Sequence, residues 1–135
     1  MKRINKKFRA YTLNELLVTL IIIGIIILIA IPILMPLITK AKSLEAKQQL
    51  AHVHMLQKGH FYAHSKYSNN LNEIGFEHEK VITEGGKANY QIEIVEASIT
   101  GFKAKATALV DFDGDGQFNV WEIDENKNLI EIVQD

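Results

Sequence analysis

The stretch YTLNELLVTLIIIGIIILIAIP, residues 11–32, decides the fold of this chain. It opens an apolar run, Leu16 to Ile38, of 23 residues without a charged side chain. At about 1.5 Å per residue, a helix of that length spans the hydrocarbon core of a bilayer, which is about 30 Å thick. One carboxylate, Glu15, stands at the start of the run. A charge at the edge of a membrane-length helix is costly and usually functional.

Charge patterning predicts how this helix crosses a membrane. The first ten residues hold five of the 15 basic residues, and the positive-inside rule therefore keeps residues 1–10 in the cytoplasm. Without them, 10 basic residues face 16 acidic ones, a balance of −6 that argues against nucleic acid as a partner. The chain has no cysteine, which excludes disulfides and cysteine metal sites. A length of 135 residues is consistent with one globular domain and one membrane anchor.

Three interpretations of the apolar run compete. A secretory signal peptide has a shorter apolar region followed by a small-residue cleavage site, whereas polar helix follows directly here. An ordinary single-pass anchor fits the length but explains neither Glu15 nor the interior prolines, Pro32 and Pro36. Proline removes a helix hydrogen bond and bends or locally melts the helix.

The third interpretation is a resemblance. An aromatic residue, Thr-Leu, a variable residue and Glu follow a basic leader, and Gly24 and an Ala-Ile-Pro triplet ending at Pro32 lie further along. This pattern resembles the N-terminal motif of type IV pilins and type II secretion pseudopilins. The resemblance implies cleavage by prepilin peptidase after Ala10 and methylation of the new amino group of Tyr11. The family more often has Gly and Phe at these two positions. Glu15 matches the glutamate that pairs with the N-terminal amine of a neighbouring subunit.

The resemblance also implies a location and partners. The chain would cross the bacterial inner membrane once, with a short cytoplasmic N-terminus, and then join a periplasmic or extracellular filament. Its partners would be further copies of itself, other pilin-like subunits, prepilin peptidase, the inner-membrane assembly machinery and, before assembly, the lipid bilayer. The pairing role of Glu15 is physically reasonable, because a cationic partner offsets the cost of placing a carboxylate in hydrocarbon.

From Thr39 to about His64 the helix is expected to continue as an amphipathic segment with one face on a globular domain. Leu44, Gln48, Ala51 and Met55 lie along one side, with Leu50, Val53 and Leu56 nearby. His60 and His64 share a helix face and could bind a metal. No third metal ligand lies at a spacing typical of a metal site, so the preferred interpretation is that the two histidines lie on the surface or pack against the domain.

From Ala88 the apolar period changes to two. Alternation predicts strands around Tyr90–Ile94 and Phe102–Val110, and two shorter strands follow at Val120–Ile123 and Leu129–Val133. Four short strands with brief connections predict an antiparallel meander with one face on the helix. The fold class is therefore α+β, a long helix packed on a small antiparallel sheet, pilin-like.

Between the second and third strands, DFDGDGQFNVWE at residues 111–122 satisfies the twelve-residue EF-hand calcium loop pattern. The flanks are strand-like, so a calcium loop joining two strands is expected rather than an EF-hand domain. Calcium suits the three aspartates better than magnesium, which prefers fewer carboxylates. The alternative is an acidic, glycine-rich turn that binds nothing. The predicted ligands are Asp111, Asp113 and Asp115, with the Gln117 carbonyl and then Asn119, Glu122 and Asp124.

The predicted organisation is a leader at 1–10, an assembly helix at 11–38, an amphipathic helix at 39–64 and a calcium-stapled globular domain at 65–135. The favoured function is a structural filament subunit, either a pilin or a type II secretion pseudopilin. The alternative is a membrane-anchored calcium-binding module that never polymerises. An enzyme has little support, because the sequence holds no nucleophile–base pair and no phosphate-binding loop.

Overall fold

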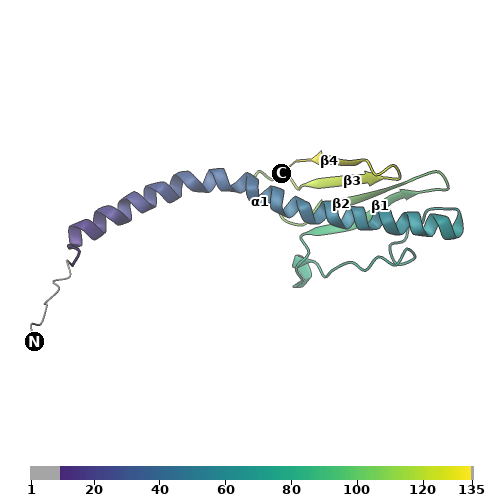
Figure 1. Cartoon of the computed structure of the whole chain (residues 1–135), viewed down its shortest axis with the longest axis horizontal. Helices are drawn as coiled ribbons and strands as arrows, with labels where there is room; N and C mark the ends of the chain where they lie inside the picture. The colour runs from purple at the N-terminus through teal and green to yellow at the C-terminus, as the bar shows by residue number, and fades with distance from the viewer. Residues whose placement is uncertain (1–9, 135) are drawn as a thin grey trace, which may run out of the picture. The chain divides into compact units, whose positions relative to one another are not determined.

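The computed structural model describes residues 10–134, and Figure 1 shows its elements. One long helix, α1 (Leu13–His64), is followed by a short 3₁₀ helix, η1 (Ile82–Glu84), and four strands. The strands β1 (Tyr90–Ala97), β2 (Phe102–Ala108), β3 (Val120–Asp124) and β4 (Leu129–Val133) form one antiparallel sheet in the order β1-β2-β3-β4. The predicted α+β fold, with a long helix on an antiparallel meander, is confirmed.

The chain divides into two compact units, Met1–Leu34 and Met35–Asp135. In the described part of the first unit, every large apolar side chain from Leu13 to Leu34 is exposed. Of the described helices, only α1 is long and apolar enough to cross a membrane. Its assigned span continues through both Pro32 and Pro36. Since neither proline has an N–H, each leaves one helical carbonyl without its usual donor.

In the second unit, α1 packs on the sheet through a stripe of mostly small or polar residues. The buried members are Thr39, Ser43, Ala46, Leu50, Val53 and Gln57. Of the apolar residues named for this segment, Leu50 and Val53 are fully buried, whereas Leu44 and Met55 are 54% and 63% exposed and do not face the domain. The buried residues follow helical spacing, but several of them are small or polar. Their hydrophobic pattern in the sequence is therefore weaker than that of the larger apolar residues on the same helix.

The sheet face under α1 is lined by alanines of β2. Ala104, Ala106 and Ala108 are at most 2% exposed and belong to the same core as Ala46 and Leu50 of the helix. Small side chains on both elements therefore fill the part of the core where the helix faces the sheet. The larger aromatic and aliphatic core residues lie around this contact, among them Tyr67, Phe76, Tyr90, Ile92, Phe102, Trp121 and Ile123.

A buried glutamine fastens the chain that leaves the helix. Gln57 is fully buried, and its amide nitrogen donates to the Ser68 carbonyl at 2.5 Å. Its side-chain oxygen accepts the Ser68 N–H at 3.0 Å. The two bonds satisfy both backbone groups of a residue that is only 3% exposed. They therefore fix the connection to the sheet against the last turns of α1.

Candidate functional sites

Glu15 caps the start of α1. Its Oε2 accepts hydrogen bonds from the Thr12 backbone N–H at 2.8 Å and from the Thr12 hydroxyl at 2.9 Å. In return, the Glu15 N–H donates to Thr12 Oγ1 at 3.3 Å. This reciprocal arrangement is a capping box, which satisfies backbone donors that a helix start otherwise leaves unpaired.

This local role was not predicted, although Thr-x-x-Glu before an apolar run is its signature. The capping bonds use only Oε2. Among residues 10–134, Oε1 of Glu15 accepts no hydrogen bond. One oxygen of the carboxylate can therefore serve its own helix while the other remains available to a second donor.

The predicted cleavage site lies immediately before the cap. Ala10 and Tyr11 precede the helix, both are exposed, and the Tyr11 side chain is 83% exposed. The bond between them lies in irregular chain rather than in the helix. Apart from Ala10, the predicted leader lies outside the described residues.

The acidic loop brings three carboxylates together. Oxygens of Asp111, Asp113 and Asp115 lie within 4.8 Å of one another, and these residues could hold a metal ion. Gly114 and Gly116 have φ angles of +86° and +88°, a conformation that favours glycine. The expectation that Gly116 makes a sharp turn is confirmed, and Gly114 makes a second one.

Backbone hydrogen bonds orient these carboxylates. The Gly116 N–H donates to Asp111 Oδ2 at 2.7 Å and the Gly114 N–H to Asp111 Oδ1 at 2.5 Å. These bonds stabilise the ionised form and lower the pKa of Asp111. The Asp115 N–H donates to Asp113 Oδ1 at 3.0 Å. The loop backbone thus holds the ionised aspartate side chains in place.

The structure does not bring all the predicted ligands to this cluster. Asn119 is fully buried, and its Oδ1 accepts the Tyr90 hydroxyl at 2.8 Å while its Nδ2 donates to Glu131 at 2.7 Å. Both ends of the Asn119 amide are therefore engaged within the domain. Glu122 lies within β3, paired with Lys105, and not in the cluster of converging aspartates.

Asp124 has a different local role. It lies at the far end of β3, about 13 Å along the strand from Val120 at about 3.3 Å per residue. Its oxygens accept the backbone N–H groups of Asn126 and Asn128 at 2.9 and 2.8 Å, and the Asn128 side chain at 2.7 Å. Desolvation opposes ionisation, but the bonds from Asn128 and Asn126 outweigh it and lower the pKa of Asp124. Asp124 therefore closes the β3–β4 turn.

An aromatic residue anchors the loop to the domain. Phe112 lies between the first two aspartates, and its ring centroid is 5.8 Å from that of Tyr90. The Lys42 ammonium lies 4.6 Å from the Phe112 centroid. The loop is thereby attached to both the helix and the first strand, while Gln117, whose N–H donates to Asp115 at 2.7 Å, remains exposed.

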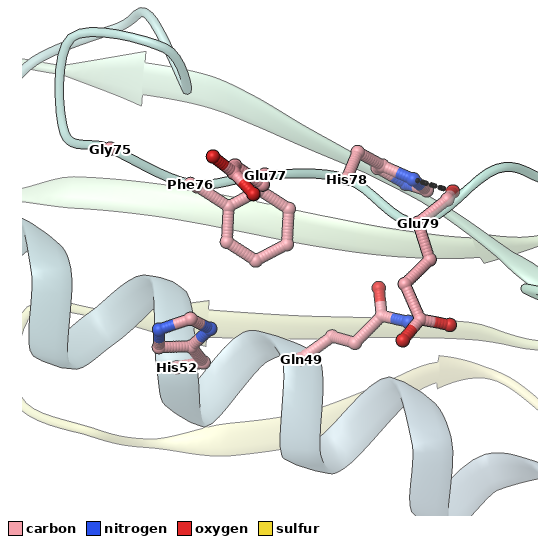
Figure 2. A pocket seen from close by; sticks show the side chains of 7 residues that line it. All are labelled: Gln49, His52, Gly75, Phe76, Glu77, His78 and Glu79. Atoms are coloured by element: carbon pink, nitrogen blue, oxygen red, sulfur yellow. Dashed lines mark hydrogen bonds between the residues drawn. The ribbon is translucent and has the colours of Figure 1, made fainter.

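A hollow of about 520 Å³ lies between α1 and the segment 75–79 (Figure 2). Its wall includes His52, whose ring is 5.7 Å from that of Phe76. His78 accepts the Ile92 N–H through Nε2 at 2.9 Å, so the neutral ring fastens this segment to β1. His78 Nδ1 donates to the Glu79 carbonyl at 2.6 Å. Both nitrogens of His78 are thus used structurally.

In the comparison with known proteins, no family model matches the chain. It is similar to the type IV major pilin protein PilA of Myxococcus xanthus strain DK1622, with 36% identity over 92 residues. The match covers 68% of this chain but only 40% of that protein, so the chain spans less than half the length of the relative. This similarity, together with the long apolar-to-amphipathic helix packed on an antiparallel sheet, supports the type IV pilin family. That family points to a structural rather than an enzymatic protein.

Proposed function

We propose that the chain is a subunit of a type IV pilus-like filament, cut after Ala10 and assembled through the first half of α1. The observation that carries this proposal is the exposure of every large apolar side chain from Leu13 to Leu34. Such a surface needs an apolar environment, because burying it contributes about 25 cal/mol per Å². The bilayer supplies that environment before assembly, with residues 1–10 in the cytoplasm, and neighbouring helices supply it afterwards.

In this proposal, Glu15 sets the axial alignment between the α1 helices of neighbouring subunits. Its Oε2 is held by Thr12, while Oε1 has no partner among residues 10–134. We infer that Oε1 accepts the methylated amine of Tyr11 from an adjacent copy. Removing one member of such a buried charge pair leaves the other charge unpaired, which strongly destabilises the assembly. The pair therefore favours the one axial alignment of identical helices in which both charges meet.

Two variants separate pairing from capping. Glu15→Gln removes the charge but retains a residue that serves a capping box, whereas Thr12→Ala removes the cap and retains the charge. We expect membrane levels near those of the parent for both, filaments from Thr12→Ala, and none from Glu15→Gln. The measurement is the yield of sheared filaments against the amount of subunit in the membrane. Normal filaments from Glu15→Gln would refute the pairing.

The mass of the mature subunit tests the processing. We expect a chain that begins at Tyr11 and carries one additional methyl group. A filament subunit that retains residues 1–10 would contradict both the cleavage and the amine that Glu15 requires. The matched control is a variant with a bulky residue at the junction, Ala10→Trp, which should retain the leader and remain in the membrane.

We further propose that the acidic loop binds calcium and stabilises the domain. Three exposed carboxylates within 4.8 Å of one another fit a cation that takes six to eight oxygen ligands, with water completing the set. Asp111, Asp113, Asp115 and the Gln117 carbonyl would hold it, and the bound cation would remove the repulsion among the aspartates. The proposed set leaves out Asn119, whose amide bonds within the core, and Asp124, which closes the β3–β4 turn, because neither belongs to the cluster of converging carboxylates.

Thermal unfolding of the full chain in detergent tests calcium binding. Trp121 is the only tryptophan and is 9% exposed, so its fluorescence reports unfolding of the domain. We expect calcium to raise the midpoint over a chelator, magnesium to have little effect, and Asp113→Asn to abolish the response. Glu122→Gln should keep the response. An identical midpoint with calcium and with chelator would reject the site without affecting the filament proposal.

A further inference from the structure

Two histidines lie together at the C-terminal end of α1. His60 and His64 are four residues apart, which places them on one face of the helix. Their ring centroids are 4.3 Å apart, and the ring planes meet at 71°. His60 is half-buried and His64 is exposed. The pair is therefore in contact and reachable from solvent.

A backbone carbonyl fixes the tautomer of His60. Its Nδ1 lies 2.9 Å from the Lys66 carbonyl oxygen, which can only accept, so Nδ1 carries a proton and, in the neutral ring, Nε2 has the lone pair. Metal-binding histidines are commonly held in this way, with the second ring nitrogen donating to a carbonyl. Within residues 10–134, neither His60 Nε2 nor either nitrogen of His64 has a hydrogen-bond partner.

A carboxylate lies beside the pair. Glu73 accepts a hydrogen bond from the Ser68 hydroxyl, and it interacts electrostatically with His60 and His64. Gln57 fixes Ser68 against the helix through its two backbone bonds. The Glu73 carboxylate thus interacts electrostatically with two imidazoles whose neutral forms offer lone pairs. This combination favours binding of a cation that prefers nitrogen ligands.

We propose that His60 and His64 bind one divalent transition metal ion of the Zn²⁺ class. Nε2 of His60 and a ring nitrogen of His64 are the protein ligands, water completes the coordination, and Glu73 adds charge from the second sphere. Imidazole suits Zn²⁺, Cu²⁺ and Ni²⁺, whereas the aspartates of the acidic loop suit Ca²⁺. The two sites therefore differ in the metal that each selects.

The metal would stabilise the last turn of the helix. Gly59 lies directly before the pair, and glycine weakens a helix interior. The bond from His60 to Lys66 links the same ring to the chain that leaves the helix. A metal bridging His60 and His64 would therefore fix the end of α1 and residues 65–68 together.

Calorimetric titration of the tag-free full chain in detergent with Zn²⁺ tests this site. Excess Ca²⁺ is present throughout so that the acidic loop does not compete. The variants are His60→Gln, which keeps a donor for the Lys66 carbonyl, and His64→Gln. The control is His52→Gln, an exposed histidine two turns earlier on the same helix.

We expect the parent and the control to bind one equivalent of Zn²⁺, and each test variant to bind at least about tenfold more weakly. Zn²⁺ should also raise the unfolding midpoint of the parent and the control and leave both test variants unchanged. Absence of binding in the parent, or undiminished binding in either test variant, would overturn the proposal.

Discussion

Removal of the Gln57 side chain is the most direct test of how the domain is held to its helix. In Gln57→Ala, both bonds to Ser68 are lost, and the Ser68 N–H and carbonyl remain in a site where the residue is 3% exposed. A buried polar group left without a partner costs about 1–3 kcal/mol. Two such groups predict a loss of about 2–6 kcal/mol in the free energy of unfolding.

The fluorescence of Trp121 gives the assay. For a domain of about 100 residues, 1 kcal/mol lowers the midpoint by about 4–8 °C, so we expect a fall of about 8 °C or more. Gln57→Glu keeps an acceptor for the Ser68 N–H but has no donor for its carbonyl, and should also be less stable than the parent. Gln48→Ala, at an exposed position on the same helix, is the control.

A fall of less than about 1 kcal/mol in the free energy of unfolding of Gln57→Ala, equal to that of the control, would show that the two bonds to Ser68 do not stabilise the domain. It would mean that water or another donor replaces the amide at Ser68. The connection after the helix would then be held by its apolar contacts alone.

Two further predictions concern the surface of the domain. Because the folded pKa of Asp124 is lowered, its ionised form contributes stability above the ordinary aspartate pKa, and that contribution is lost as pH falls through the folded value. The stability difference between the parent and Asp124→Asn, measured by urea unfolding, should therefore shrink between about pH 6 and pH 3; a constant difference would contradict this. Gly59→Ala should raise the free energy of unfolding by about 0.5–1 kcal/mol, since an added Cβ meets nothing within 4 Å; a lower midpoint would show that this glycine is required.

Much of the fold followed from periodicity. The apolar run predicts the first half of α1, and the helix end near His64 and all four strands lie close to where alternation placed them. These features are local, since each depends on the spacing of residues within one segment. The converging Asp111, Asp113 and Asp115 were likewise predictable, because spacing and glycines bring them together within five residues.

Features that depend on contacts between segments were not predictable in the same way. The buried face of the helix was predicted only in part: Leu50 and Val53 were expected, whereas Ser43, Ala46 and Gln57 are recognisable as core only once the other side of the core and the Ser68 backbone are known. Asn119 matched a ligand position in the loop pattern, but the hydroxyl of Tyr90, 29 residues away in sequence, engages it instead. The capping role of Glu15 was local and could have been found from Thr12.

The alanines of β2 have a consequence for how this chain can vary. Ala104, Ala106 and Ala108 are buried in the same core as Ala46 and Leu50 of α1, so a larger side chain at any of them would overpack that core. An exposed apolar residue such as Met55 has no such restriction. Across the sequences that share this fold, the smallest core residues should therefore tolerate substitution least, and diversity should concentrate in the loops and on the outer faces.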